Sequence, residues 1–264
     1  SVSPDGNTLA MENGLIRRTI ALKIGKSKQG TATIAFDNLM TGQAILRAVR
    51  PEAILTIDSQ TFAVGGLREQ PNHAFLQPAW LNQMEPAPND WQLIGHEIGD
   101  IEPRMKWKTT RPHAPGVAWP PKGRSLRLDF AAPSSASSTN LESPDSPDRT
   151  TPKPQVMVSI HYEIYDGLPL ISKWLVVHNQ SSQEIQLEKF TAELLAVVEH
   201  SNPVEDRPGV PLPVPTVLHV ETDQAFGGFN FEQANRHAVR WLPDPEFHTQ
   251  VNYLNDIVNN YKHY

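Results

Sequence analysis

A histidine and a carboxylate stand close together in one apolar run of the chain. His161 and Glu163 are two residues apart among β-branched and aromatic neighbours, and side chains at that spacing share a face of a strand. Such a pair could exchange protons with a ligand or contribute to a metal site. The plainer interpretation, which we favour, is a polar, solvent-facing edge of a sheet.

Ten histidines occur in the chain, and their spacing bears on metal binding. No His-x-His or His-Glu-x-x-His pattern is present, and isolated histidines more often satisfy local hydrogen bonds than hold a metal. We therefore predict no metal site and no cofactor. The absence of cysteine excludes disulfides and thiolate zinc sites as well, while the cellular compartment stays open.

The segment from Pro71 to Gly123 combines prolines, widely spaced aromatic residues and basic side chains, which indicates ordered loops. The face of an aromatic ring can stack on the apolar side of a sugar, while charged groups hydrogen-bond the sugar hydroxyls. This composition predicts a sugar-binding loop, with the candidates Trp107, Trp119, Arg104 and Arg111. The alternative for each tryptophan is a structural role, in which the ring holds the long loop against the rest of the protein.

The formal net charge of -6 narrows the classes of partner. Nucleic acid or an anionic membrane would favour a basic face, so we expect neither as the main partner and expect a small or neutral one such as a carbohydrate. No apolar run approaches the roughly 20 residues that a membrane-spanning helix needs, so the sequence does not predict a membrane anchor.

Short strands separated by turns must position these side chains. Asn13-Gly14 lies between the apolar runs Thr8–Met11 and Leu15–Leu22, which predicts an opening hairpin. Strand patterns then recur about every ten residues, a spacing typical of sandwiches and barrels. Helical patterns are limited to Ala79–Met84 and Asn252–Tyr261. We therefore predict an all-β, two-sheet fold.

The clearest run of elements lies in the second half of the chain. Val156–Tyr165 and Pro169–His178 are predicted strands, Asp166-Gly167 forms the turn between them, and a third strand follows. This order predicts a β-meander of three successive strands. Trp174 stands in the middle of the second strand, so we expect its indole in the core.

A low-complexity segment precedes the meander. Residues 131–154, which follow a predicted strand at Leu126–Phe130, are rich in Ser, Pro, Thr and Asp. Such a segment has little apolar area to bury, which predicts a flexible insertion. A linker between two domains is the alternative. The strands before the segment look incomplete without the meander, so we predict a single domain over residues 1–264.

The meander resembles the amino-terminal β-supersandwich of α-galactosidase-like glycoside hydrolases, a fold related to galactose mutarotase. In that family an extended strand leads to a Gly-x-Pro turn, a second strand ends in Asn, and a third strand follows a polar turn. The residues that carry the resemblance are Tyr162–Ile171, Trp174–Asn179, Ile185–Leu187 and, in the opening hairpin, Asn13–Arg18. The resemblance implies an all-β, two-sheet supersandwich of the galactose mutarotase-like type.

The same resemblance carries an expectation about function. In such hydrolases a (β/α)₈ barrel bears the two catalytic carboxylates, and this sequence lacks the alternating strands and helices of a barrel. The implied role is a non-catalytic N-terminal domain that supports a catalytic barrel domain or partner subunit and contributes to sugar binding. The alternatives are a stand-alone mutarotase-like sugar epimerase and a carbohydrate-binding module.

Mutarotases that resemble this fold use histidines and a carboxylate for proton transfer at the sugar ring. Residues of these types near predicted strands are His96, Glu97, His161, His178, Glu193 and His200. None of them matches the mutarotase pattern residue by residue. The non-catalytic role is therefore favoured over an enzyme.

Overall fold

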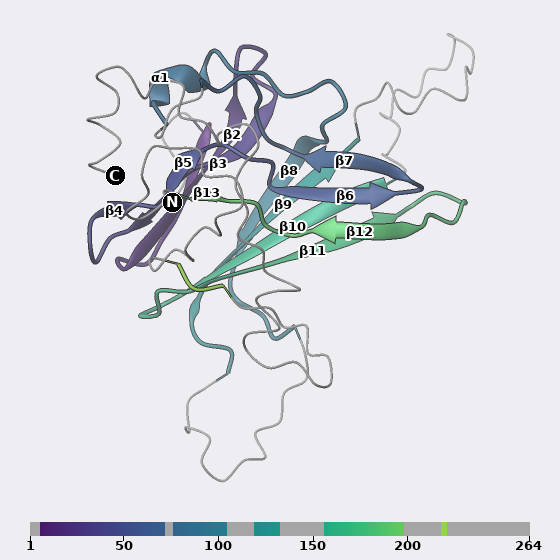
Figure 1. Ribbon diagram of the computed structural model, residues 1–264. Helices are drawn as coiled ribbons and strands as arrows, with labels where there is room; N and C mark the ends of the chain where they lie inside the picture. Colours follow the sequence, from purple (N-terminus) through teal and green to yellow (C-terminus); the bar gives the residue numbers. More distant parts are fainter. Residues whose placement is uncertain (1–5, 72–75, 105–118, 133–155, 198–217, 221–264) are drawn as a thin grey trace, which may run out of the picture.

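The computed structural model describes residues 6–71, 76–104, 119–132, 156–197 and 218–220 of the chain (Figure 1). These residues form thirteen strands and one short helix, and neighbouring strands in every sheet run antiparallel. The chain is an all-β, sandwich-like protein, which confirms the fold class expected from the sequence. The galactose mutarotase-like supersandwich stays a prediction.

The first sheet begins with the predicted hairpin and has the strand order β1-β2-β3-β4. Its strands are β1 (Thr8–Glu12), β2 (Ile16–Ile24), β3 (Gly30–Asn38) and β4 (Gln43–Ala44). The Asn13 side chain shapes the turn, because its Oδ1 accepts the backbone N–H groups of Leu15 and Ile16, each at 3.1 Å. Its Nδ2 donates to the backbone carbonyl of Tyr165 at 2.7 Å, so the hairpin is fastened to a distant part of the chain.

The second sheet has the order β11-β10-β9-β8. Its strands are β8 (Gln92–Gly99), β9 (Gly123–Ala131), β10 (Val156–Tyr165) and β11 (Ile171–Asn179). The bounds of β10 are those predicted from the sequence, and β10 lies between β9 and β11. β8 falls in the proline-rich segment whose composition indicates loops, so this strand is an addition to the predicted fold.

The remaining strands form two smaller sheets, with the orders β12-β6-β7 and β13-β5. These strands are β5 (Leu46–Ala48), β6 (Ala53–Ile57), β7 (Gln60–Val64), β12 (Leu187–Thr191) and β13 (Ala196–Val197), and the helix α1 spans Pro78–Leu81. β12 pairs with β6 and not with β11. The prediction of a three-stranded meander is therefore wrong, and only its first hairpin, β10–β11, is present.

The side chains of β10 alternate between an apolar side and a polar side of the sheet, and both sides are largely buried along this strand. Ile160 and Tyr162 are fully buried in one cluster with apolar residues of β9, in the same sheet, and of β1, β2, β6 and β7, in two other sheets. Ser159, His161 and Glu163 occupy the alternate positions and point to the other side. We call this second side of the β8–β11 sheet the outer face.

Two sequence predictions concern segments at or beyond the edge of the described residues. The insertion predicted at 131–154 starts too early, because Ala131 is the last residue of β9 and is buried. Residues 133–155 and the helix candidate at 252–261 lie outside the described residues. Among the residues that the structure describes, no helix is long and apolar enough to cross a membrane.

Gly123, the first residue of β9, lies against the backbone of β10. A β-carbon at this position would be 2.1 Å from the carbonyl oxygen of Ile164. Gly123→Ala should therefore displace the backbone and lower the free energy of unfolding by about 1–3 kcal/mol, the usual cost of overpacking. Gly95→Ala is the matched control, because space is open at that position of β8. Urea denaturation measures both variants, and equal stability would contradict the close approach at Gly123.

Candidate functional site

One row of polar and aromatic side chains crosses the outer face from strand to strand. The register places Glu97 of β8 opposite Arg127 of β9, Arg127 opposite His161 of β10, and His161 opposite Trp174 of β11. Arg127 Nη2 lies 2.9 Å from Glu97 Oε2. The rings of His161 and Trp174 are stacked, with centroids 4.8 Å apart and planes 10° apart.

A third planar group joins this stack. Arg104, which follows β8 in the chain, places its guanidinium carbon 4.1 Å from the centroid of the Trp174 ring, a cation–π contact. Trp174 is half-buried, so the expectation that its indole lies in the core is wrong. The register gives the reason, because Lys173 and Leu175 take the inward positions of β11 opposite Tyr162 and Ile160.

A second row of the outer face centres on a buried serine. Ser159 Oγ donates to Asp129 Oδ1 at 2.6 Å and lies 3.2 Å from His178 Nε2. Asp129 also accepts a hydrogen bond from Arg127 Nε at 3.1 Å. A hydrolytic triad needs the imidazole between the hydroxyl and the carboxylate. Here the hydroxyl is in the middle, so this row is a hydrogen-bonded polar surface without an activated nucleophile.

The two residues of the predicted acid–base pair have different environments. Burial, and after it the nearby Arg127, lower the pKa of His161 below its ordinary value. Glu163 is only 4% exposed, and its Oε2 accepts a hydrogen bond from the hydroxyl of Tyr165 at 2.5 Å. The expectation of a solvent-facing edge is wrong for Glu163, because β10 lies inside the sheet. Burial, and then this hydrogen bond, raise the pKa of Tyr165.

An open cleft lies at the end of the sheet where β9 begins and β10 ends. We call it the end cleft; its volume is about 460 Å³, and it is lined by Asp100, Ile101, Pro120, Pro121, Lys122, Gly123, Arg124 and Asp166. Arg124 Nη1 donates to Asp100 Oδ1 at 2.6 Å, and both of these side chains are exposed. Trp119 precedes Pro120 in the chain and is 61% exposed. The cleft thus combines apolar walls with charged groups of both signs.

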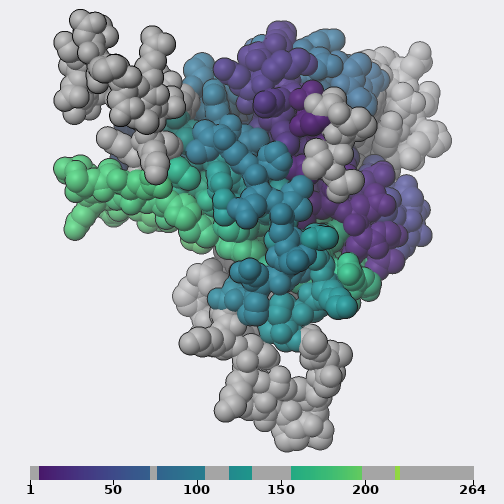
Figure 2. Space-filling model, turned by 180° about the vertical axis from the view of Figure 1, so that it is seen from behind, coloured from purple at the N-terminus to yellow at the C-terminus, as the bar shows by residue number. Residues whose placement is uncertain are grey.

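The predicted sugar-binding residues fall in three places. Arg104 contacts Trp174 on the outer face, and Trp119 is exposed and precedes Pro120, a lining residue of the end cleft. Trp107 and Arg111 lie outside the described residues, as does His200. Sequence reasoning missed Arg127 and Asp129, although their two-residue spacing in a strand places them on one face. Seen from behind, the blue to teal segments that include β8 form the middle of the visible surface (Figure 2).

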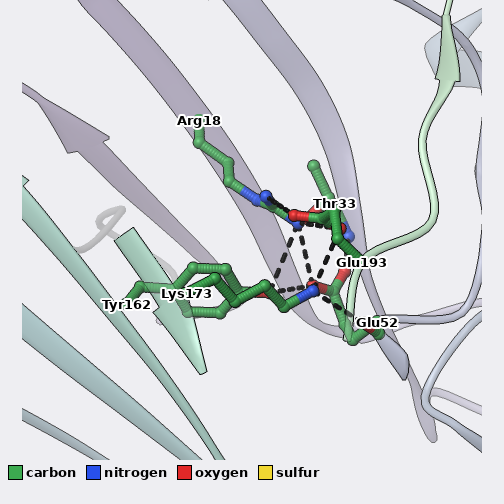
Figure 3. A network of polar contacts seen from close by, with 6 residues as sticks. All are labelled: Arg18, Thr33, Glu52, Tyr162, Lys173 and Glu193. Carbon is green, nitrogen blue, oxygen red and sulfur yellow. Dashed lines mark hydrogen bonds and ion pairs between the residues drawn. The ribbon is translucent and has the colours of Figure 1, made fainter. Parts of the chain in front are cut away.

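A separate set of charged residues lies between the sheets, on the core side (Figure 3). Arg18 is 2% exposed and Glu52 is 1% exposed. Arg18 Nη2 donates to Glu52 Oε2 at 3.1 Å, and Arg18 Nη1 donates to Glu193 Oε2 at 2.5 Å. Lys173 Nζ donates to the backbone carbonyl of Glu52 at 2.6 Å and to Glu193 Oε1 at 3.0 Å. We call these residues, with Thr33 and Tyr162, the buried charge network.

The remaining contacts of the network surround Glu52. The Tyr162 hydroxyl and the backbone N–H of Thr33 both donate to its carboxylate. Burial alone would raise the pKa of Glu52, but Arg18, Lys173 and these hydrogen bonds outweigh it, so the pKa lies below its ordinary value. Burial lowers the pKa of Lys173, which Glu193 and Glu52 offset only in part.

The network joins parts of the chain that are far apart in sequence. Arg18 comes from β2, Thr33 from β3, Tyr162 from β10 and Lys173 from β11, while Glu193 follows β12. No buried side-chain nitrogen or oxygen of these network residues lacks a hydrogen-bond partner. Its two cations and two carboxylates satisfy one another, and of these four side chains only Glu193, at 28% exposed, reaches solvent to a substantial degree. The network therefore joins the sheets to one another.

Comparison of the chain with protein-family models, with curated proteins and with solved structures finds no match. The side chains of the outer face and the end cleft are therefore the features of the chain that bear on its function.

Proposed function

We propose that this chain is a non-catalytic domain that binds carbohydrate on the outer face and accompanies a catalytic barrel, either in the same protein or in a partner subunit. The observation that carries the binding role is the contact of Arg104 and His161 with Trp174 on that face. Sugars stack on the face of an indole, so a bound sugar would take the place of the Arg104 guanidinium over the Trp174 ring. The catalytic partner follows from the family resemblance of the sequence.

The groups beside Trp174 suit the hydroxyls of a sugar. Arg127 and Glu97 supply donors and acceptors at a half-exposed position, with side chains 43% and 63% exposed. His161 has a lowered pKa, so near neutral pH its imidazole is uncharged and offers one donor and one acceptor. This mixture of an aromatic ring and neutralised polar groups favours an uncharged polyhydroxyl ligand over a strongly charged one.

The carboxylates of the outer face support a binding role over a catalytic one. Glycoside cleavage needs one carboxyl group to protonate the leaving oxygen and a second on the other side of the bond. Asp129 is held by Arg127 and Ser159, and Glu163 is buried against Tyr165. Glu97 is exposed and pairs with Arg127, but a single exposed carboxylate does not supply the two that such chemistry requires.

Trp174→Ala tests the proposal. An array of defined glycans, followed by calorimetry on those that bind, should show that wild type binds and that the variant binds at least about tenfold more weakly, a change equivalent to about 1.4 kcal/mol. Phe190→Ala is the matched control, since this aromatic side chain is 59% exposed but belongs to β12 in another sheet. Melting curves report whether each variant is folded. A wild-type protein that binds no glycan on the array would overturn the proposal.

A further inference from the structure

We infer that the ligand of this domain is an oligosaccharide whose chain occupies two subsites, one at Trp174 on the outer face and one in the end cleft. The inference rests on the proposed function and adds the length of the ligand to it. The end cleft is suited to a sugar unit because Ile101, Pro120 and Pro121 provide apolar walls, while charged side chains provide hydrogen-bonding groups.

An aromatic side chain stands beside this cleft as well. Trp119 directly precedes Pro120, which lines the cleft, and 61% of Trp119 is exposed. Exposed tryptophan is uncommon, because its large apolar area favours burial. Arg104 contacts Trp174 on the outer face. At the end cleft Arg124 is a lining residue, and Trp119 is the chain neighbour of another lining residue, Pro120.

One short segment connects the subsites. Asp100 and Ile101 line the end cleft, and Arg104, three residues after Ile101, reaches Trp174. Three residues span at most about 11 Å of backbone. The distance along β10 is similar. Tyr165 pairs with Gly123, which lines the cleft, and His161 lies four residues away, or about 13 Å along the strand. These distances exceed the width of one sugar ring but are short enough for a chain of a few sugars.

The charge balance of the end cleft also fits a neutral chain. Asp100 and Asp166 face Lys122 and Arg124 around the same cleft, and Arg124 already forms an ion pair with Asp100. A cleft for an anionic ligand would carry an excess of cations. The equal numbers of acidic and basic side chains instead provide donors and acceptors for hydroxyl groups, and the net charge of these side chains is zero.

The test compares ligands of increasing length. Wild type, Arg124→Ala and Trp119→Ala are titrated by calorimetry with the mono-, di-, tri- and tetrasaccharides of the glycan series that wild type binds on the array. For the two cleft variants we expect unchanged affinity for the shortest ligand that binds and a loss of at least about tenfold for the tri- and tetrasaccharide. Because both partners of the Arg124 ion pair are exposed, Arg124→Ala should keep the wild-type melting temperature.

Arg17→Ala is the control, because this arginine forms a comparable surface ion pair with Asp37 in the first sheet. Affinities that do not rise with ligand length, or cleft variants that bind every length as wild type does, would overturn the inference while leaving the proposed function intact. Equal losses at every length would also overturn it, because they would mean one site and not two. A wild type that binds no glycan removes both proposals.

Discussion

Arg18→Met should lower the free energy of unfolding by about 3–5 kcal/mol, the cost of breaking a buried ion pair by removing one partner. The substitution keeps an unbranched side chain of similar length, so it removes the charge and the donors with little change in packing. It leaves the carboxylates of Glu52 and Glu193 without their shared guanidinium. The two carboxylates then share Lys173 as their one remaining cation, and an incompletely paired buried charge is strongly disfavoured, so the folded state is destabilised.

The neighbouring residue provides the control for this prediction. Arg17 also forms ion pairs, with Asp37 and Glu12, but its side chain is 42% exposed. Arg17→Met should therefore change the unfolding free energy by less than about 1 kcal/mol. Urea denaturation of both variants gives the comparison, and the slope of each transition shows whether unfolding remains two-state. Equal stability of the two variants would mean that the buried charge network relaxes around the missing charge.

The signal for the buried charge network was present in the sequence. Arg18 stands at the same strand phase as Ile16 and Ile20, so a strand that buries those two residues must also bury the arginine. Lys173 likewise shares its phase with Ile171 and Leu175. A charge at an inward position needs a buried partner, but which carboxylates supply it depends on contacts between distant segments, and strand patterns do not contain that information.

Local patterns predicted the strands better than they predicted their partners. The bounds of β10 were predictable because apolar, β-branched and aromatic residues fill it and turn residues follow it. β12 looked like the next strand of a meander because successive strands usually pair. Its pairing with β6 joins segments more than a hundred residues apart, so no local pattern could indicate it.

Two further errors of the sequence prediction have a common cause, which is weak alternation of apolar and polar residues along a strand. β8 contains Gly95 and Gly99, and none of its residues is buried, so it shows neither the apolar run nor the strict alternation of a predicted strand. In β11 both phases carry large apolar side chains, such as Trp174 on one and Leu175 on the other. The sequence therefore identified the strand but not the phase, and Trp174 was assigned to the core although it lies on the outer face.

Glu52→Gln should make the stability of the protein less dependent on acid pH. The pKa of Glu52 in the folded protein lies below the ordinary value of 4.5, because Arg18, Lys173 and two hydrogen bonds outweigh the effect of burial. A carboxyl whose folded pKa is depressed contributes stability that is fully present above its unfolded pKa. That contribution is lost as the pH falls from about 4.5 through the folded pKa, whereas glutamine has no proton to gain.

We therefore expect the difference in unfolding free energy between wild type and Glu52→Gln to become smaller in acid. At pH 7 Glu52→Gln should be less stable than wild type by about 3 kcal/mol, the lower range for a broken buried pair, and the gap should narrow steadily once the pH falls below 4.5. Urea denaturation across this pH range measures the difference in unfolding free energy between variant and wild type. The titration of carboxyls outside the buried charge network is common to both proteins and cancels. Glu12→Gln is the control, because Glu12 is 44% exposed in a 3.7 Å surface pair and should follow wild type within about 1 kcal/mol throughout. A gap for Glu52→Gln that stays constant in acid would show that Glu52 has the same pKa in the folded and the unfolded protein, and would remove the charge pairing from the account of its role.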